Sequence, residues 1–262
     1  MITLLNGESW NRYEILQKMY DDSFYYGHLG KHALSSSSLK KLNEGPLTYE
    51  LSLRKNDNSN QALRDGRLIH MCLLEPEKIN DLIITEGTKA KKEFKEATAF
   101  HGDHMVYTQS EMDNAYWIAE AVRKNDEADF LLHGTEREVP AIEEIDGLAF
   151  RAKADAIDLN SGHIIDLKTT SIPVSERSFK SSANNFMYNL QAALYCHIFG
   201  ATQFTFLVIH KETKTIGIFD CSQEFLDIGW FLVENGIDIY KRNFLNEEAR
   251  KNLRNYVVRG TL

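Results

Sequence analysis

Residues 136–170 carry three strand-like segments separated by two short turn signals. The run EREVPAIEEIDGLAFRAKADAIDL alternates between apolar and polar residues around Asp146 and Gly147, and NSGH leads into GHIIDLKTT. Alternating segments that are joined by Asn, Asp and Gly turns predict neighbouring antiparallel strands. Such a sheet must be covered by other elements, and this requirement constrains the fold of the whole chain.

The flanking segments have the apolar spacing of helices. Helical patterns cover residues 9–25, 35–46, 61–76 and 108–124 before the strands, and residues 184–200 and those after Ser222 behind them. Residues 203–220 read as a hairpin, and residues 55–60 as a polar loop. We therefore predict one α/β domain over residues 1–262, with a mainly helical portion at 1–134 and a mixed sheet flanked by helices at 135–262.

Composition limits the class of protein. The 262 residues are 43% hydrophobic and 26% charged, and neither a long apolar run nor a leader is present, which predicts a soluble cytoplasmic protein that does not bind membranes. A net charge of −8 argues against a protein that coats nucleic acid non-specifically. A nuclease stays open, because carboxylates that bind divalent cations are themselves acidic. The three cysteines are too scattered for a metal site made of cysteine alone.

Asp166 and Lys168 interrupt the apolar run of GHIIDLKTT and are two positions apart, so they share one face of the predicted strand. If residues 160–163 form the turn, Leu159 faces Ile164 and Asp155 faces Lys168. Asp155 and Asp166 then become diagonal neighbours, roughly 5–8 Å apart at Cβ, and can hold one divalent cation between them.

A cross-strand ion pair explains the same residues. Asp155 would pair with Lys168, and Asp166 would be solvated, as in many surface hairpins. The apolar flanks indicate a buried strand, and two acids against one base leave an excess of negative charge that a cation would neutralise. Spacing alone leaves both interpretations open.

Five segments together resemble the PD-(D/E)XK nuclease superfamily, and within it the RecE (exodeoxyribonuclease VIII)-like phage exonucleases. They run in order from Ser35 to Tyr195, and they are SSSSLKKLNEGPLTYEL, GRLIHMCLLEPE, FRAKADAID, IIDLKTT and YNLQAALY. The resemblance implies a restriction-endonuclease-like core, in which helices flank a mixed central sheet.

The resemblance also implies a metal site. Asp155 and Asp166 would ligate Mg²⁺ or Mn²⁺ together with the backbone carbonyl of Leu167, with two ions in each active site. Lys168 would orient the attacking water, and His70 would lie beside the metals. Without the resemblance, a histidine on a half-buried helix is more simply a core residue.

Further residues take roles by the same resemblance. Glu136 matches an acidic residue that would ligate the second metal or contact it through water, with a solvated strand end as the alternative. Glu138 shares its face and competes for the assignment. Gln191 and Tyr195 are four apart on one helix face. By the resemblance they brace the active site or contact DNA, and the alternative is an interface between helix and sheet.

Phosphate contacts have basic candidates, with solvated surface charge as the alternative for each. They are Arg64, Arg67, Arg151 and Lys153.

The implied activity is metal-dependent hydrolysis of linear double-stranded DNA from its ends, 5′ to 3′, which leaves 3′ overhangs for phage-type recombination. The implied partners are a single-strand annealing protein and further copies of the chain in a ring-shaped homo-oligomer. The implied location is the cytoplasm of a bacterial host that carries a phage or prophage. The alternatives are an endonuclease or single-strand-specific nuclease on the same fold, or a module that binds DNA or a repair complex without cutting.

Overall fold

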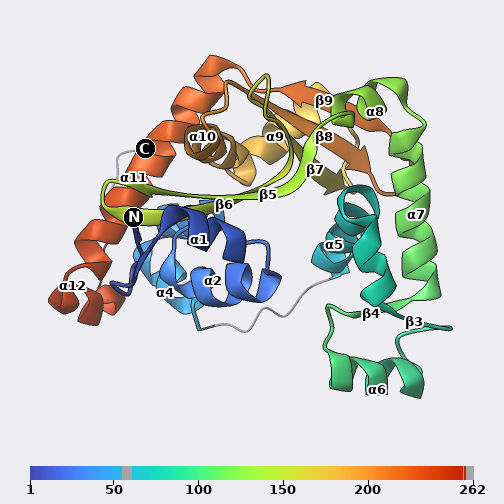
Figure 1. Ribbon diagram of the computed structural model, residues 1–262, viewed down its shortest axis with the longest axis horizontal. Coiled ribbons are helices and arrows are strands. Elements are labelled where there is room, and N and C mark those ends of the chain that lie inside the picture. The colour runs from blue at the N-terminus through green and yellow to red at the C-terminus, as the bar shows by residue number, and fades with distance from the viewer. Residues whose placement is uncertain (55–60, 256, 258–262) are drawn as a thin grey trace.

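The computed structural model describes residues 1–54, 61–255 and 257, so the polar loop predicted over 55–60 lies outside it. Its centre is a five-stranded sheet in the order β5-β6-β7-β8-β9 (Figure 1). The strands are β5 (Glu136–Ile145), β6 (Leu148–Asp158), β7 (His163–Thr170), β8 (Gln203–His210) and β9 (Ile216–Asp220). β7 and β8 are parallel, whereas the other neighbours are antiparallel. The predicted mixed sheet is confirmed.

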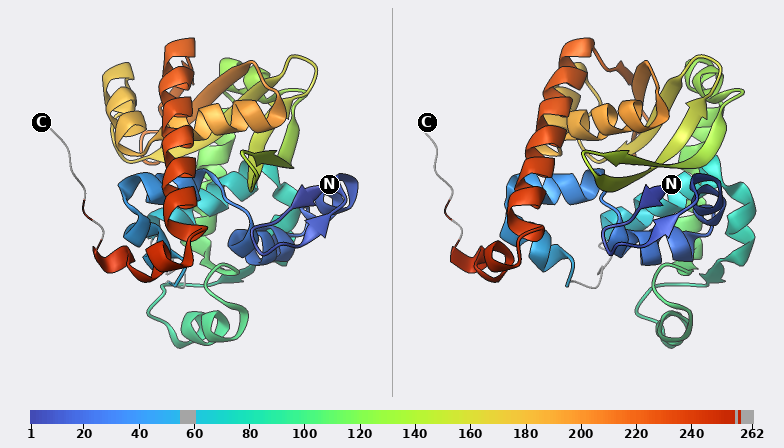
Figure 2. Two further views of the ribbon diagram at one scale, coloured as in Figure 1. Left: turned by 90° about the vertical axis from the view of Figure 1, so that its left-hand side faces the viewer. Right: turned by 60° about the vertical axis from the view of Figure 1, so that its left-hand side comes forward.

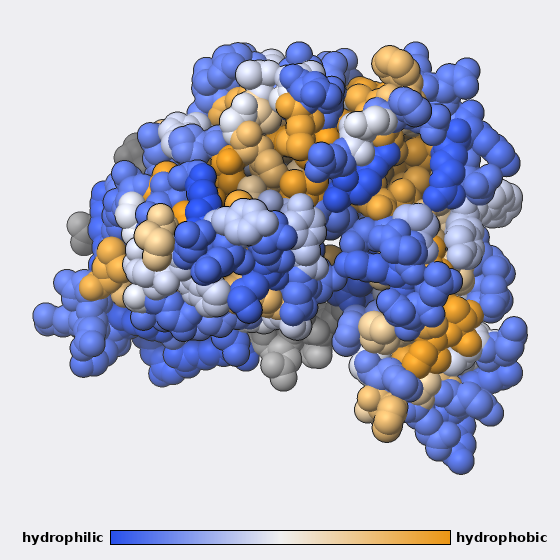
Figure 3. All heavy atoms as spheres, in the orientation of Figure 1, coloured by the Kyte–Doolittle hydropathy of each residue, from blue (hydrophilic) through white to orange (hydrophobic). Residues whose placement is uncertain are grey.

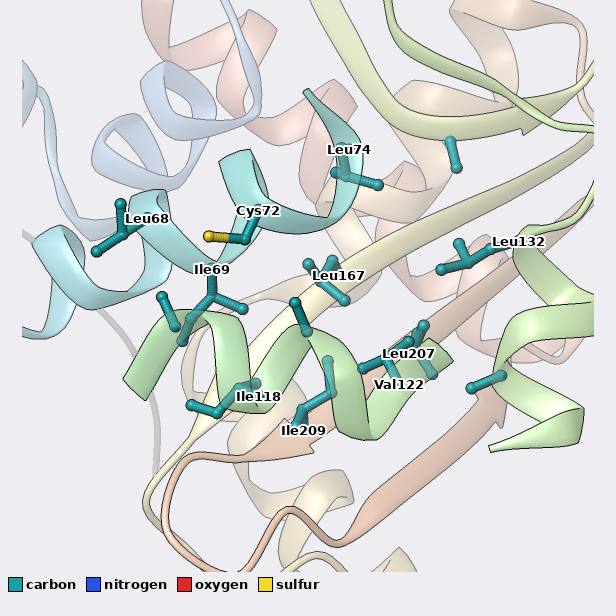
Figure 4. Packing of buried hydrophobic residues seen from close by; sticks show 14 of the residues in the cluster. Leu68, Ile69, Cys72, Leu74, Ile118, Val122, Leu132, Leu167, Leu207 and Ile209 are labelled. Carbon is teal, nitrogen blue, oxygen red and sulfur yellow. The ribbon is translucent and has the colours of Figure 1, made fainter. Parts of the chain in front are cut away.

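Three helices cover one face of the sheet. They are α5 (Gln61–Leu74), α7 (Gln109–Arg123) and α8 (Asp126–Leu132). Their apolar side chains pack on Leu167, Leu207 and Ile209 of the sheet (Figure 4). The capping box of Thr108 and Glu111 forms as expected and starts α7. This layer places α5 against β7.

The crossover between the parallel strands β7 and β8 covers the other face. It contains α9 (Glu176–Asn185) and α10 (Tyr188–Phe199), and the long α11 (Gln223–Phe244) packs outside α10 (Figure 2). Aromatic side chains from β8 and α9 fill the layer, among them Phe179, Phe204 and Phe206.

The N-terminal part packs at the β5–β6 end of the sheet. Its elements are β1 (Ile2–Thr3), β2 (Ser9–Trp10), α1 (Arg12–Lys18), the π-helix η1 (Ser23–His28), α2 (Leu29–His32), α3 (Ser36–Glu44) and α4 (Pro46–Ser52). The single helix predicted over residues 9–25 is wrong. Asn11 caps α1 by accepting hydrogen bonds from the N–H groups of Tyr13 and Glu14, and Asp21 accepts from Ser23 where η1 begins, so two helices replace one.

A lobe built on residues 76–108 projects away from the sheet (Figures 1 and 2). It holds the 3₁₀ helix η2 (Pro76–Asp81), β3 (Ile83–Thr85), α6 (Lys92–His101) and β4 (Val106–Thr108). Elsewhere, α11 is followed by α12 (Glu247–Lys251) and the 3₁₀ helix η3 (Leu253–Asn255). The face seen in Figure 3 is mostly hydrophilic with some hydrophobic areas, and it is hollowed between α1 and α2 on one side and α5 on the other. Among the described residues, no helix is long and apolar enough to cross a bilayer.

Candidate metal centre

The candidate site lies where the ladder between β6 and β7 ends. Within the described part of the chain, the last pair of this ladder is Ala156 with Ile165. Asp155 follows on β6, and its Oδ2 accepts a hydrogen bond from the backbone N–H of Leu167 at 2.8 Å. The carboxylate takes the place of a ladder partner and is thereby fixed beside β7.

The register of this hairpin differs by two residues from the predicted one. Ile164 lies opposite Ile157 and not opposite Leu159. The side chain of Asp158 organises the turn, because it accepts hydrogen bonds from the backbone N–H of Asn160 and from the hydroxyl of Ser161. The turn therefore occupies residues 159–162, one position earlier than predicted.

A shift of two residues keeps every side chain on its predicted face, because the strand repeat is two. Asp155 and Asp166 still share a face, but the continued register places them directly opposite each other. The predicted pairing of Asp155 with Lys168 is therefore wrong. The ion pair forms within β7 instead, where Nζ of Lys168 lies 2.5 Å from Oδ2 of Asp166.

His70 reaches the same end of β7 from α5. Its Nε2 lies 2.9 Å from the carbonyl oxygen of Leu167, and its Nδ1 lies 3.6 Å from Oδ2 of Asp155. If Nε2–H donates to that carbonyl, Nδ1 keeps its lone pair and faces the carboxylate. A backbone carbonyl that orients a histidine in this way is a common support of metal ligation.

Glu138 completes a group of three potential ligands. It occupies the position on β5 across from Asp155, with a left-handed backbone (φ +50°). One ligand atom from each of His70, Glu138 and Asp155 can be chosen so that all three atoms lie within 4.8 Å of one another. Glu136 is exposed at the start of β5, opposite Ile157, and lies outside this group, so of the two acids that the sequence offered the structure brings Glu138 to the potential ligands.

The group of His70, Glu138 and Asp155 contains more negative charge than the neighbouring cations offset. Burial, followed by repulsion from Asp155 and Glu75, raises the pKa of Glu138 to about 8. Burial also raises the pKa of Asp155, and the charge of Asp166 adds to this, while His70 opposes it. Both carboxylates are held where ionisation is unfavourable without a nearby cation.

Asp166 connects the group to α10. Its Oδ1 accepts a hydrogen bond from Nε2 of Gln191 at 2.6 Å. Its Oδ2 is buried beside Lys168 but receives no hydrogen bond of good geometry within the described chain. A buried carboxylate oxygen whose partner is one ammonium keeps lone pairs that can contact a divalent cation, which fits a site with nitrogen and oxygen ligands.

Lys168 is held as a cation. Its Nζ lies against Asp166 and 3.4 Å from Oε1 of Gln191. Burial alone would lower the pKa of Lys168, but the charges of Asp166 and Asp155 outweigh it and raise that pKa. Tyr195, one turn after Gln191, packs on Phe204, which places it in the interface between helix and sheet.

The four predicted phosphate contacts separate into different environments. Arg64 is buried and donates hydrogen bonds to Asp103 and to the carbonyl of Val106 at 2.7 Å, so its predicted contact with DNA is wrong. Arg67 is exposed on α5, one turn before His70.

The remaining two lie on β6. The guanidinium of Arg151 lies over the ring of Tyr25, 4.5 Å from its centroid. Lys153 is buried and donates to Asp22 at 2.7 Å.

Asp22 and Lys78, which lie near the group, had no signal in the sequence. Asp22 accepts hydrogen bonds from Lys153 and Lys78, and Lys78 also pairs with Glu75 at 2.6 Å. These residues come from three separate segments, and only the tertiary fold brings them together. Glu75, Lys78 and Lys153 line a cavity of about 240 Å³ together with Glu138.

Comparisons with known proteins agree with this architecture. The model of a family described as "PDDEXK-like domain of unknown function (DUF3799)" matches residues 35–251. The crystal structure of a "Putative exonuclease" from Eubacterium rectale is 16% identical, with a TM-score of 0.62 over 92% of this chain and 95% of that one, which shows a shared fold. A phage-related exonuclease from Haemophilus somnus 129PT is 12% identical, with a TM-score of 0.37 over 79% and 93% of the two chains. No curated protein matches the chain.

Proposed function

The chain belongs to the family of PDDEXK-like domains, as its resemblance to the PD-(D/E)XK superfamily predicted, and on this premise we propose that it is a metal-dependent nuclease that degrades linear DNA from its ends. The observation that carries the proposal is the group of His70, Glu138 and Asp155 beside the pair of Asp166 and Lys168. Three ligand groups of mixed nitrogen and oxygen chemistry and an adjacent ammonium are the parts that phosphodiester hydrolysis requires.

A divalent cation, Mg²⁺ or Mn²⁺, would be held by His70, Glu138 and Asp155, with a second ion beside the carboxylate of Asp166. When bound, it supplies positive charge that stabilises the charge developing on the phosphate.

Lys168 acts as a hydrogen-bond donor in this proposal. Because its pKa is raised, it stays protonated at neutral pH and does not serve as a base. Asp166 and Gln191 fix its ammonium, which then orients the water that attacks phosphorus. Gln191 acts through Asp166 and Lys168, so it is a positioning residue.

The finer parts of the proposal rest on the five motifs that resemble RecE-like exonucleases. We propose that the substrate is linear duplex DNA and that it is degraded from 5′ to 3′. The 3′ overhangs that remain would be bound by a single-strand annealing protein in phage-type recombination. Several copies of the chain would form a ring around the DNA.

Digestion of linear and closed circular duplex DNA tests the activity, with Mg²⁺, Mn²⁺ or EDTA. We expect loss of the linear substrate with either metal and none with EDTA. Asp166→Ala should slow cleavage by about 10³-fold or more, because it releases both Lys168 and Gln191. Glu136→Gln is the matched control and should cut at the wild-type rate.

The outcomes separate the alternatives. No metal-dependent loss of linear duplex would exclude the exonuclease, and cutting of closed circles would indicate an endonuclease. Preference for single strands would exclude the duplex substrate. Substrates labelled at the 5′ or the 3′ end give the polarity.

A further inference from the structure

Lys40 approaches the candidate site from α3 and has no role in the arrangement described so far. Its side chain is half-buried, and its Nζ lies 5.1 Å from the centroid of the Tyr188 ring. Nζ of Lys168 lies 5.0 Å from the centroid of the same ring. Two ammonium groups therefore meet at one aromatic side chain, at the edge of the candidate metal centre.

The two lysines differ in their partners. Lys168 has the carboxylate of Asp166 at 2.5 Å. For Lys40, the aromatic ring of Tyr188 is the partner, and no carboxylate or carbonyl oxygen of the described residues forms an ion pair or hydrogen bond with its ammonium. Burial, with repulsion from Lys168, lowers the pKa of Lys40 to about 7, although Asp166 opposes this. A half-buried ammonium that lacks an anion is unfavourable for the protein alone.

The position of Lys40 is fixed by rigid elements. Ser35 caps α3 by accepting a hydrogen bond from the backbone N–H of Ser38, and Leu39 of α3 packs in one core cluster with Leu190 of α10. Tyr188 opens α10 directly after Met187, whose left-handed backbone (φ +49°) is unusual for a residue with a side chain. Strained backbone of this kind often accompanies functional positions.

We propose that Lys40 binds a non-bridging oxygen of a DNA backbone phosphate that neighbours the phosphate under attack. This inference rests on the proposed nuclease function and assigns one contact to its substrate. The nucleic-acid strand would run from the group of His70, Glu138 and Asp155 past Lys168 to Lys40. A phosphate there supplies the anion that Lys40 lacks, because phosphate contacts by lysine position the strand without reading its sequence.

Lys40→Met tests the site by removing the charge while keeping the length of the apolar stem, and Lys40→Arg keeps the charge. Lys41→Gln is the matched control, because Lys41 is the next residue and pairs with Glu44 at 2.9 Å. Fluorescence anisotropy measures the Kd for a labelled duplex in EDTA at several salt concentrations. We expect Lys40→Met to raise Kd about 5- to 10-fold and to reduce the salt slope of log Kd by about 1. Lys40→Arg should bind within about 2-fold of wild type, as should Lys41→Gln.

Thermal unfolding separates this role from a structural one. Because Lys40 lacks an anion, Lys40→Met should leave Tm unchanged or raise it while DNA binding weakens. A lower Tm with unchanged Kd and salt slope would overturn the proposal and leave a contact that only supports Tyr188.

Cleavage kinetics keep the two proposals apart. With Mg²⁺, we expect Lys40→Met to raise KM with little change in kcat, since the contact is made before and during the reaction. If wild type does not cleave but binding depends on Lys40, the nuclease proposal fails and the phosphate site stands. If wild type cleaves and Kd, salt slope and KM are insensitive to Lys40→Met, the phosphate site fails alone.

Discussion

Lys153 lies between two carboxylates, Asp22 on one side and Glu138 on the other. The two differ in how much positive charge the protein places beside them. Asp22 accepts hydrogen bonds from Lys78 at 2.8 Å and Lys153 at 2.7 Å. These bonds overcome the effect of burial and lower the pKa of Asp22. Glu138 lies 4.0 Å from Lys153, and its pKa is raised.

The difference shows how to separate a structural ion network from a ligand group. Around Asp22 the protein supplies its own positive charges, so the carboxylate is stable as an anion. Around Glu138 and Asp155 it supplies carboxylates and an imidazole but too little positive charge. Charge balance, more than the number of acids, therefore supports the proposal that the group of Glu138 and Asp155 binds a cation.

Asp155→Asn should have the largest effect on this contrast. It keeps the shape of the side chain but removes the charge that a cation needs, so cleavage should fall by about 10³-fold or more. The rise in Tm that Mn²⁺ gives the wild-type protein should also be lost. Asp22→Asn should keep both the cleavage and the rise in Tm. Equal responses of the two variants to Mn²⁺ would show that the Asp155 group is not the metal site.

Glu138→Gln and Glu136→Gln form a second test, because the same substitution is made two positions apart on one strand. We expect Glu138→Gln to weaken Mn²⁺ binding about 10- to 100-fold, whereas Glu136→Gln leaves it unchanged. Isothermal titration of the metal-free protein with Mn²⁺ measures both. A larger loss for Glu136→Gln would restore the assignment based on the sequence.

The sequence was sufficient for the fold class and for the face of each strand residue. Alternation over residues 136–170 predicts the three antiparallel strands, and the face on which Asp155 and Asp166 lie survives a shift of two. The register itself depended on the turn, where the side chain of Asp158 binds Ser161 and begins the loop one residue early. Residue patterns describe periodicity well, but turn geometry sets the alignment.

The sequence was insufficient where contacts join distant segments. Glu136 and Glu138 lie on the same face of β5 and carry the same charge. They differ in what lies across from them on β6, which is Ile157 for Glu136 and Asp155, where the β6–β7 ladder has ended, for Glu138. Arg64 matched a pattern of exposed basic residues, yet its partners Asp103 and Val106 are about forty positions away and bury it.

The pH dependence of stability should differ between the metal-free and the metal-bound protein. The pKa of Glu138 is raised in the folded state, so the contribution of this group is fully present below its unfolded pKa and is lost as pH rises to about 8. In EDTA, we expect a loss of roughly 3 kcal/mol in the free energy of unfolding between pH 5 and 8. Glu138→Gln should flatten this slope, and Mn²⁺ should reverse it because the metal displaces the proton.

Urea unfolding at each pH gives these free energies. Other titrating groups contribute to both proteins, so the difference between wild type and Glu138→Gln isolates Glu138. A wild-type stability in EDTA that rises between pH 5 and 8 more than that of Glu138→Gln would contradict the unbalanced charge of this group.

Asp22→Asn should have the smallest effect, and on stability alone. It leaves Lys153, whose side chain is 8% exposed, without a full counter-charge. Because the carboxylate of Asp22 is itself 47% exposed and partly screened, we expect a loss of about 1 kcal/mol in urea unfolding. Asp21→Asn is the control and should change stability less, since the asparagine oxygen still accepts from the N–H of Ser23 and its amide N–H can donate to the Ser23 hydroxyl. A loss of cleavage in Asp22→Asn with stability unchanged would move Asp22 from the structural network into the active site.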